Sequence, residues 1–202
     1  MEIAWIFDII GIIAFAISGF LVGIRRKFDI LGIAIMSAST AFGGGIVRDT
    51  IANRTPFVFD TYYPSITLFG VFLFCILFKK FIDDNLEQKL LFIIMDAVGL
   101  VAFAISGAII GIDSHFNLFG VIILSFITAV GGSIIRDTLI NEVPLLLRSE
   151  VYGIIAIYCA FILFCYSYFI EKYNIYVIIF VSITAFILRI VAYLRKWKLP
   201  TL

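Results

Sequence analysis

The stretch "TAFGGGIVRDT" (Thr40–Thr50) returns 88 residues later as "TAVGGSIIRDT" (Thr128–Thr138), with 8 of 11 positions identical. Each copy joins consecutive glycines to an Arg-Asp pair inside an otherwise apolar segment. Glycine disfavours a helix by about 1 kcal/mol relative to alanine, and a charged group near the middle of a bilayer costs about 2.5–3.5 kcal/mol. Because both features occur twice at the same spacing, they indicate a duplicated unit.

The duplication extends well beyond this stretch. "DIIGIIAFAISG" (Asp8–Gly19) matches "DAVGLVAFAISG" (Asp96–Gly107) at 8 of 12 positions with the same offset and no gap. We therefore expect one membrane domain over residues 1–202, with a first repeat over about 4–82 and a second over about 90–169.

Composition places the chain in a membrane. It is 63% hydrophobic and 14% charged, with a mean hydropathy of +1.15, whereas soluble domains are about half apolar and a quarter charged. The net charge of +1 gives no reason to expect a nucleic-acid partner. Apolar runs near the bilayer-crossing length of about 20 residues predict an all-α protein with seven transmembrane helices, at about 4–24, 30–51, 64–82, 90–111, 117–139, 150–169 and 175–194.

Three helices per repeat fix the relation between the two copies. Because three is odd, the second copy starts on the opposite face of the membrane, so the repeats are inverted and related by a pseudo-twofold axis in the membrane plane. The helix at 175–194 belongs to neither repeat. Of the Lys and Arg residues near the span ends, ten fall on one side and two, Arg54 and Lys172, on the other. This bias predicts an N-terminus outside and a cytoplasmic C-terminus.

The glycines fall within the second helix of each repeat. They are Gly43, Gly44 and Gly45 in the first copy, and Gly131 and Gly132 in the second. One interpretation is that they break helices 2 and 5, which leaves polar backbone that must face protein or a watery cavity. The other is close helix packing through small residues.

The charged pair that follows favours a pathway. Arg48 and Asp49, repeated as Arg136 and Asp137, lie one turn beyond the glycines, and charged groups inside a membrane commonly mark an ion or substrate route. Since adjacent helix residues point about 100° apart, we expect reciprocal pairs across the repeats, Arg48 with Asp137 and Arg136 with Asp49. A purely structural role for these charges is the alternative.

Two further acidic residues occupy equivalent positions. Asp8 and Asp96 open the first helix of each repeat, where they form pore mouths on opposite faces or simply lie at the interface. Ser18 and Ser106 line a polar passage or, as serines in membrane helices commonly do, bond back to their own helices. The sequence contains no Ser-His-Asp set, phosphate loop or metal-ligand cluster, which argues against an enzyme and against any cofactor.

These motifs resemble the trimeric intracellular cation channel family, in its bacterial and archaeal branch. The doubled glycine-Arg-Asp motif, the paired "DxxGxxAFAxSG" openings and the three-plus-three-plus-one helix count carry the resemblance over essentially the whole chain. It implies a homotrimer in the inner (plasma) membrane, with a pore inside each protomer that passes potassium and some sodium. The implied pore residues are Gly43, Gly44, Gly45, Arg48, Asp49, Gly131, Gly132, Arg136 and Asp137. In the second copy Ser133 replaces the third glycine and offers a hydroxyl to the passage.

Two functions follow from this sequence. The first is a monovalent cation channel, with membrane lipids around it and no bound metal beyond transient monovalent cations. The second is a secondary transporter of a small solute, an amino acid such as glycine, because inverted repeats with broken helices suit both, and some bacterial relatives of this family are labelled glycine transporters.

Overall fold

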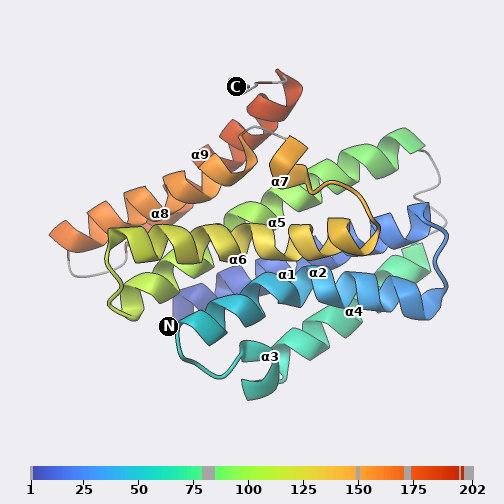
Figure 1. The fold of residues 1–202 in the computed structure, drawn as a ribbon, viewed down its shortest axis with the longest axis horizontal. Helices are drawn as coiled ribbons and strands as arrows, with labels where there is room; N and C mark the ends of the chain where they lie inside the picture. Colours follow the sequence, from blue (N-terminus) through green and yellow to red (C-terminus); the bar gives the residue numbers. More distant parts are fainter. Residues whose placement is uncertain (1, 79–84, 149–150, 171–173, 196, 198–202) are drawn as a thin grey trace.

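The computed structural model describes residues 2–78, 85–148, 151–170, 174–195 and 197, and it is helical throughout (Figure 1). Six helices are long and apolar enough to cross a membrane, whereas α4 has 16 described residues. The expected ends at 82 and 150 fall outside the described residues. The helices are α1 (Glu2–Arg25), α2 (Ile30–Ile51), α3 (Phe57–Asp60), α4 (Tyr63–Phe78), α5 (Asn85–Asp113), α6 (Leu118–Leu139), α7 (Leu145–Arg148), α8 (Tyr152–Phe169) and α9 (Ile175–Leu194).

The first helices of the two repeats, α1 and α5, pack against each other in opposite directions at the centre of the molecule. The Asp8 side chain near the start of α1 bonds Ser106 near the end of α5. Further along, the Phe15 and Phe103 rings meet with centroids 5.3 Å apart. This antiparallel packing is the arrangement that two inverted repeats require.

The turns that lead into α2 and α6 are also duplicated. Asp29 and Asn117 are the N-caps, and each side-chain oxygen accepts a hydrogen bond from the backbone N–H three residues later, at 2.7 and 2.9 Å. A side-chain oxygen at this position satisfies an amide that the helix leaves unpaired. The four described non-glycine residues with positive φ also pair at the same offset: Lys27 with His115, and Asn53 with Asn141. The repeat is therefore preserved in local geometry.

The expected break of α2 and α6 at the glycines is wrong. Both helices run without interruption through these residues, and no described glycine has a positive φ. In a bilayer no water replaces a lost backbone hydrogen bond, so even consecutive glycines remain helical. The alternative interpretation, close packing, is what the structure shows.

The glycines allow α2 and α6 to cross with their backbones in contact. A Cβ added to Gly44 would overlap the carbonyl oxygen of Thr128, and one added to Gly132 would overlap that of Thr40. A Cβ on Gly131 would lie 2.9 Å from the Cα of Gly44. Because the clashes are with backbone, no rotamer change relieves them.

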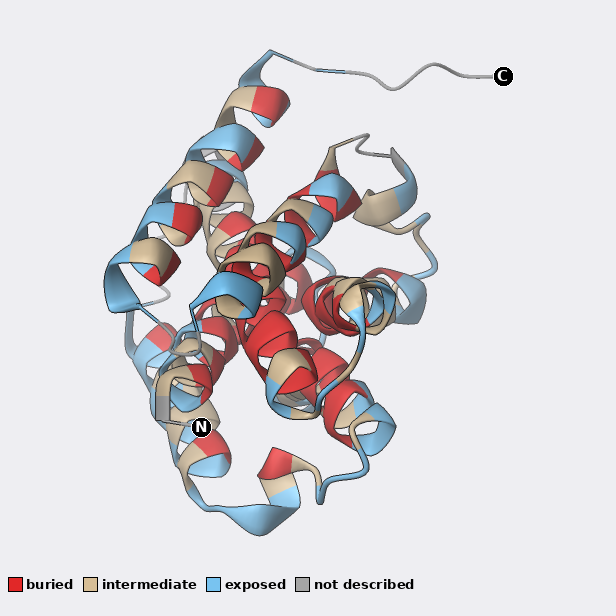
Figure 2. Cartoon of the chain, turned by 90° about the vertical axis from the view of Figure 1, so that its left-hand side faces the viewer, coloured by how far each residue is buried: buried red, intermediate tan, exposed pale blue. Residues whose placement is uncertain are grey.

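The remaining helices surround this centre. The third helices take equivalent places, α4 against α1 and α8 against α5, and α9 packs on α5 and α8 without a counterpart in the first repeat. Figure 2 shows buried residues concentrated on the inner helices and exposed residues on the outward faces. The apolar outward faces fit a lipid surrounding.

Candidate functional site

Two buried polar clusters lie at equivalent places in the two repeats. The first cluster consists of Asp8, Arg48, Asp49 and Ser106. The second cluster consists of Asp96, Arg136, Asp137 and Ser18. In each, three charged residues come from one repeat and the serine comes from the other, so each cluster joins the two halves.

In the first cluster, Arg48 holds both aspartates at once. Its Nη1 and Nη2 donate to Oδ1 and Oδ2 of Asp8 at 2.5 and 3.1 Å, and its Nε donates to Oδ1 of Asp49 at 2.9 Å. The Ser106 hydroxyl accepts from Nη1 at 2.7 Å and donates to Asp8 at 2.6 Å. The other oxygen of Asp49 accepts the backbone N–H of Phe57 at 2.8 Å. The Arg48 side chain is 1% exposed.

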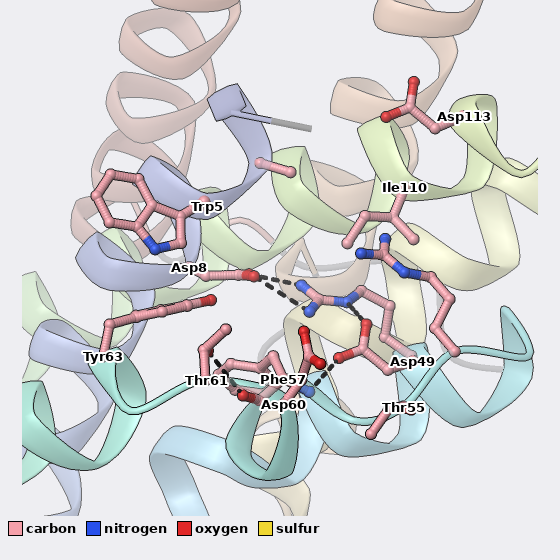
Figure 3. A pocket seen from close by; sticks show the side chains of 13 residues that line it. Trp5, Asp8, Asp49, Thr55, Phe57, Asp60, Thr61, Tyr63, Ile110 and Asp113 are labelled. Carbon is pink, nitrogen blue, oxygen red and sulfur yellow. Dashed lines mark hydrogen bonds and ion pairs between the residues drawn. The ribbon is translucent and has the colours of Figure 1, made fainter.

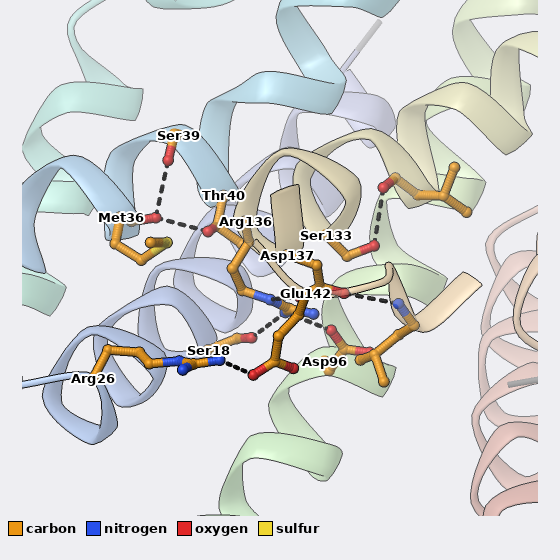
Figure 4. Close-up of polar contacts among 12 residues, drawn as sticks. Ser18, Arg26, Met36, Ser39, Thr40, Asp96, Ser133, Arg136, Asp137 and Glu142 are labelled. Carbon is orange, nitrogen blue, oxygen red and sulfur yellow. Dashed lines mark hydrogen bonds and ion pairs between the residues drawn. The ribbon is translucent and has the colours of Figure 1, made fainter. Parts of the chain in front are cut away.

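The second cluster repeats most of this geometry (Figure 4). Arg136 Nε donates to Asp137 at 2.8 Å, and Nη1 donates to Asp96 at 2.7 Å and to Ser18 at 2.6 Å. The second oxygen of Asp137 accepts the N–H of Leu145 at 2.8 Å. Nη2 of Arg136, however, has no hydrogen-bond partner within the described part of the chain.

The expected cross-repeat ion pairs are therefore wrong. Each arginine pairs with two aspartates of its own repeat: Arg48 with Asp8 and Asp49, and Arg136 with its equivalents. The long arginine side chain presents Nε to its neighbour in sequence while its terminal nitrogens reach the adjacent helix, so the 100° separation does not prevent the Arg48–Asp49 contact. The cross-repeat contact comes from the serine hydroxyl instead.

The other expected site residues have defined places. Asp8 and Asp96 are 3% and 1% exposed and are bound by the arginines. Gly43 faces Ile135 and Gly45 faces Phe57. These two glycines thus make room for side chains.

Two serines have partners that the sequence did not indicate. Ser18 and Ser106 complete the clusters rather than bonding only to their own helices. The available signal was their place in the repeated "AFAISG" segment. Ser133, by contrast, donates to its own helix at the Val130 carbonyl.

A cavity of about 140 Å³ reaches the first cluster (Figure 3). Asp8 and Asp49 form part of its wall, with the rings of Trp5 and Tyr63 beside them, 5.5 Å apart in an edge-to-face arrangement. The charged lining residues are Asp8, Asp49, Asp60, Asp113, Arg48 and Arg54. Four carboxylates against two guanidinium groups give this cavity an acidic lining.

Removing the serine hydroxyl tests whether the clusters stabilise the fold. We expect Ser106→Ala to lower the free energy of unfolding by about 1.5–3 kcal/mol, the usual contribution of a hydrogen bond to a charged group. Ser133→Ala is the matched control, since this serine is equally buried and donates only to its own helix. Thermal unfolding in detergent compares the two, and equal stability of both variants would contradict the assignment.

Membrane-length helices, a duplicated helical unit and buried ion pairs within each copy define a multi-pass α-helical membrane protein. A family model described as "Glycine transporter" matches residues 5–79 and 93–168. The UPF0126 membrane protein YvgT of Bacillus subtilis is 36% identical over 207 residues, which cover 98% of this chain and 96% of YvgT. The UPF0126 inner membrane protein YadS of Escherichia coli is 33% identical over 76% of this chain and 73% of its own length. The chain therefore belongs to the family that this model describes, and it is related to the UPF0126 membrane proteins YvgT and YadS.

Solved structures with the same fold are prokaryotic TRIC channels. A prokaryotic TRIC channel in 0.5 M KCl superposes with a TM-score of 0.88 at 30% identity, covering 98% of this chain and 99% of the other. A second structure, described in terms of conductance through TRIC cation channels, superposes with a TM-score of 0.83 at 38% identity. The match covers 98% of this chain and 96% of the other. The TRIC trimeric intracellular cation channel orthologue from Rhodobacter sphaeroides superposes with a TM-score of 0.86 at 27% identity. This match covers 98% of this chain and 100% of the other. The expected family resemblance is confirmed.

Proposed function

We propose that this protein is a monovalent cation channel of the potassium type, with one pathway inside each protomer. The observation that carries the proposal is the near full-length match, at 38% identity, to a structure described as a TRIC cation channel. The proposed pathway runs between α1, α2, α5 and α6, from the acidic cavity through the first cluster to the second. The relatives of known structure are channels, which also supports a role without enzymatic chemistry.

The charge of the clusters supports cation passage. Each cluster contains two aspartates and one arginine, so each has a formal charge of −1 with the usual protonation states. Charge of this sign raises the local cation concentration, and its effect is larger in a dry protein interior than in water. Asp60 and Asp113 at the cavity extend the same field outward.

The α2–α6 crossing is the proposed narrow point. Gly44, Gly131 and Gly132 bring the two backbones together there, between the two clusters. We assign Gly43 and Gly45 to the same segment of the route, with Ser133 beside it. Since the glycines pack rather than break the helices, passage requires α2 and α6 to separate at this point.

The proposed topology follows from the distribution of Lys and Arg residues, and the proposed assembly follows from similarity to the solved TRIC channels. We propose seven spanning helices in a single membrane domain, with α4 as the third, an N-terminus outside and a C-terminus in the cytoplasm. The name of YadS supports an inner membrane location, and the description of the Rhodobacter sphaeroides channel supports a homotrimer surrounded by lipid. Asp8 then faces the outer entrance and Asp96 the inner one.

Recording from purified protein in planar bilayers tests the channel. We expect unitary potassium currents, and we expect Asp49→Asn and Asp137→Asn to move the reversal potential in a KCl gradient toward zero, because each removes a carboxylate from the route. Asp29→Asn is the matched control, since asparagine caps the equivalent helix at position 117. Anion-selective current in the parent protein would contradict the proposal.

The alternative is a transporter of a small amino acid. The family description favours it, as does a cavity that combines Arg54 with several carboxylates and could hold both ends of a zwitterion. Saturable uptake of glycine into proteoliposomes without unitary current steps would replace the channel by this function.

A further inference from the structure

The two ends of the proposed pathway differ at several equivalent positions, and one such pair is Phe92 and Ala4. Phe92 lies four residues before Asp96 in α5, and Ala4, 88 positions earlier, lies four residues before Asp8 in α1. Residues four apart share a helix face. Each position is therefore one turn from a cluster, toward the end of the membrane nearer to that cluster.

At the second cluster this position holds an aromatic ring. The guanidinium carbon of buried Arg136 lies 4.8 Å from the Phe92 ring centroid, and that of exposed Arg25 lies 5.9 Å from the same centroid. A ring face attracts a cation most strongly where water is excluded. This contact accompanies Arg136 Nη2, the nitrogen without a hydrogen-bond partner among the described residues. The ring therefore lies between the buried cluster and the exposed basic end of α1.

At the first cluster the same position holds only a methyl group. Ala4 lines the cavity of about 140 Å³ that Asp8 and Arg48 also line. A phenyl ring at this position would extend into that cavity. The first cluster has a different ring beside its arginine, since the Arg48 guanidinium carbon lies 5.4 Å from the Phe57 ring centroid, but Phe57 lines the same cavity and does not fill it. Alanine at position 4 therefore leaves room for a cavity against the first cluster.

An ion pair adds a second layer on the covered side. Arg26, just after α1, pairs with Glu142, just after α6, and the Glu142 N–H donates to the Asp137 carbonyl at 2.9 Å (Figure 4). The equivalent positions on the other side hold Ser114 and Arg54, which form no ion pair because serine is uncharged. Both layers of closure therefore belong to the second-cluster side.

We propose that the Phe92 ring closes the entrance on the second-cluster side, and that Ala4 leaves the first-cluster entrance open. This inference rests on the proposed function in one respect, the identity of the ion that passes through the pathway. Closure itself is a matter of access to the second cluster and is measured without any current.

Thiol labelling from each side of the membrane tests this closure. In a chain whose three cysteines are replaced by alanine, Ser18→Cys reports on the second cluster and Ser106→Cys on the first. We expect a charged, membrane-impermeant methanethiosulfonate to modify Ser106→Cys but not Ser18→Cys. Adding Phe92→Ala should raise the labelling rate of Ser18→Cys by about tenfold or more, because the ring that closes the entrance, together with its cation–π contacts, is removed. Adding Ala4→Phe should protect Ser106→Cys.

The outcomes separate this inference from the proposed function. An unchanged rate at Ser18→Cys after Phe92→Ala overturns the closure by Phe92, as does an unaltered rate at Ser106→Cys after Ala4→Phe. Should Phe92→Ala fail to insert, Phe92→Leu keeps an apolar side chain but no ring faces, and the same rise is expected. The expected labelling pattern without potassium current in any variant supports the closure and removes the channel; current without that pattern does the reverse.

Discussion

Replacing Gly44 by alanine is expected to destabilise the protein by about 3 kcal/mol or more, the upper end of the usual cost of overpacking. A Cβ at this position overlaps the Thr128 carbonyl oxygen, and a backbone atom in a membrane helix cannot move aside as a side chain does. We expect α2 and α6 to separate and the melting temperature in detergent to fall. Gly132→Ala, which meets the Thr40 carbonyl, should behave in the same way.

Gly70→Ala provides the matched control for these variants. Gly70 lies in α4, and apart from its own stretch of helix no described atom lies within 4 Å of a Cβ added there. Alanine is the better helix former by about 1 kcal/mol, so this variant should be as stable as the parent or more so. Equal melting temperatures for Gly44→Ala and Gly70→Ala would show that the backbones do not touch at the crossing.

Removing Arg48 should have a comparably large effect. Arg48→Met leaves Asp8 and Asp49 buried without their cation, and breaking a buried ion pair from one side costs about 3–5 kcal/mol. We expect a strong loss of folded protein at neutral pH, with partial recovery in the double variant Asp8→Asn/Arg48→Met, which removes one of the two stranded charges. Chemical unfolding in detergent measures both effects.

Arg195→Met separates this result from a general effect of losing a positive charge. Arg195 is exposed at the C-cap of α9, where a charge contributes little to stability. If Arg48→Met and Arg195→Met unfold at the same denaturant concentration, the ion pairs of the first cluster are not what holds α1 to α2.

The helices and the inverted repeat were predictable from sequence because both depend on local pattern. The membrane spans follow from unbroken apolar runs, and the offset between Asp8 and Asp96 reappears in the structure as paired caps and paired left-handed residues. An odd number of spans per copy predicts inversion, and the antiparallel packing of α1 and α5 is the arrangement that inversion requires.

The conformation at the glycines was not predictable from helix propensity. Propensities measured in water penalise glycine partly because water competes for its backbone groups, and that competitor is missing in lipid. The close approach of Gly44 to the Thr128 carbonyl depends on which helix crosses α2 and where, and the residues of α2 alone do not contain that information.

The partners of the arginines were missed for a related reason. The presence of Arg48 and Arg136 inside the membrane indicated buried partners, but the choice between Asp8 and Asp137 depends on how α1 packs beside α2. Similarly, alignment of the two repeats shows Phe92 opposite Ala4, but the cavity beside Ala4, on which the proposed difference in access rests, is not visible in the sequence.

The exchanged serines have a consequence for how such a molecule could have arisen. Ser106 from one half completes the arginine site of the other, and Ser18 does the reverse. A lone three-helix ancestor with this sequence pattern would obtain the serine that completes its cluster only by meeting an upside-down copy of itself. Such an ancestor must insert into the bilayer in both orientations. Once two copies are fused head to tail, each copy has a single fixed orientation, and dual insertion is no longer needed.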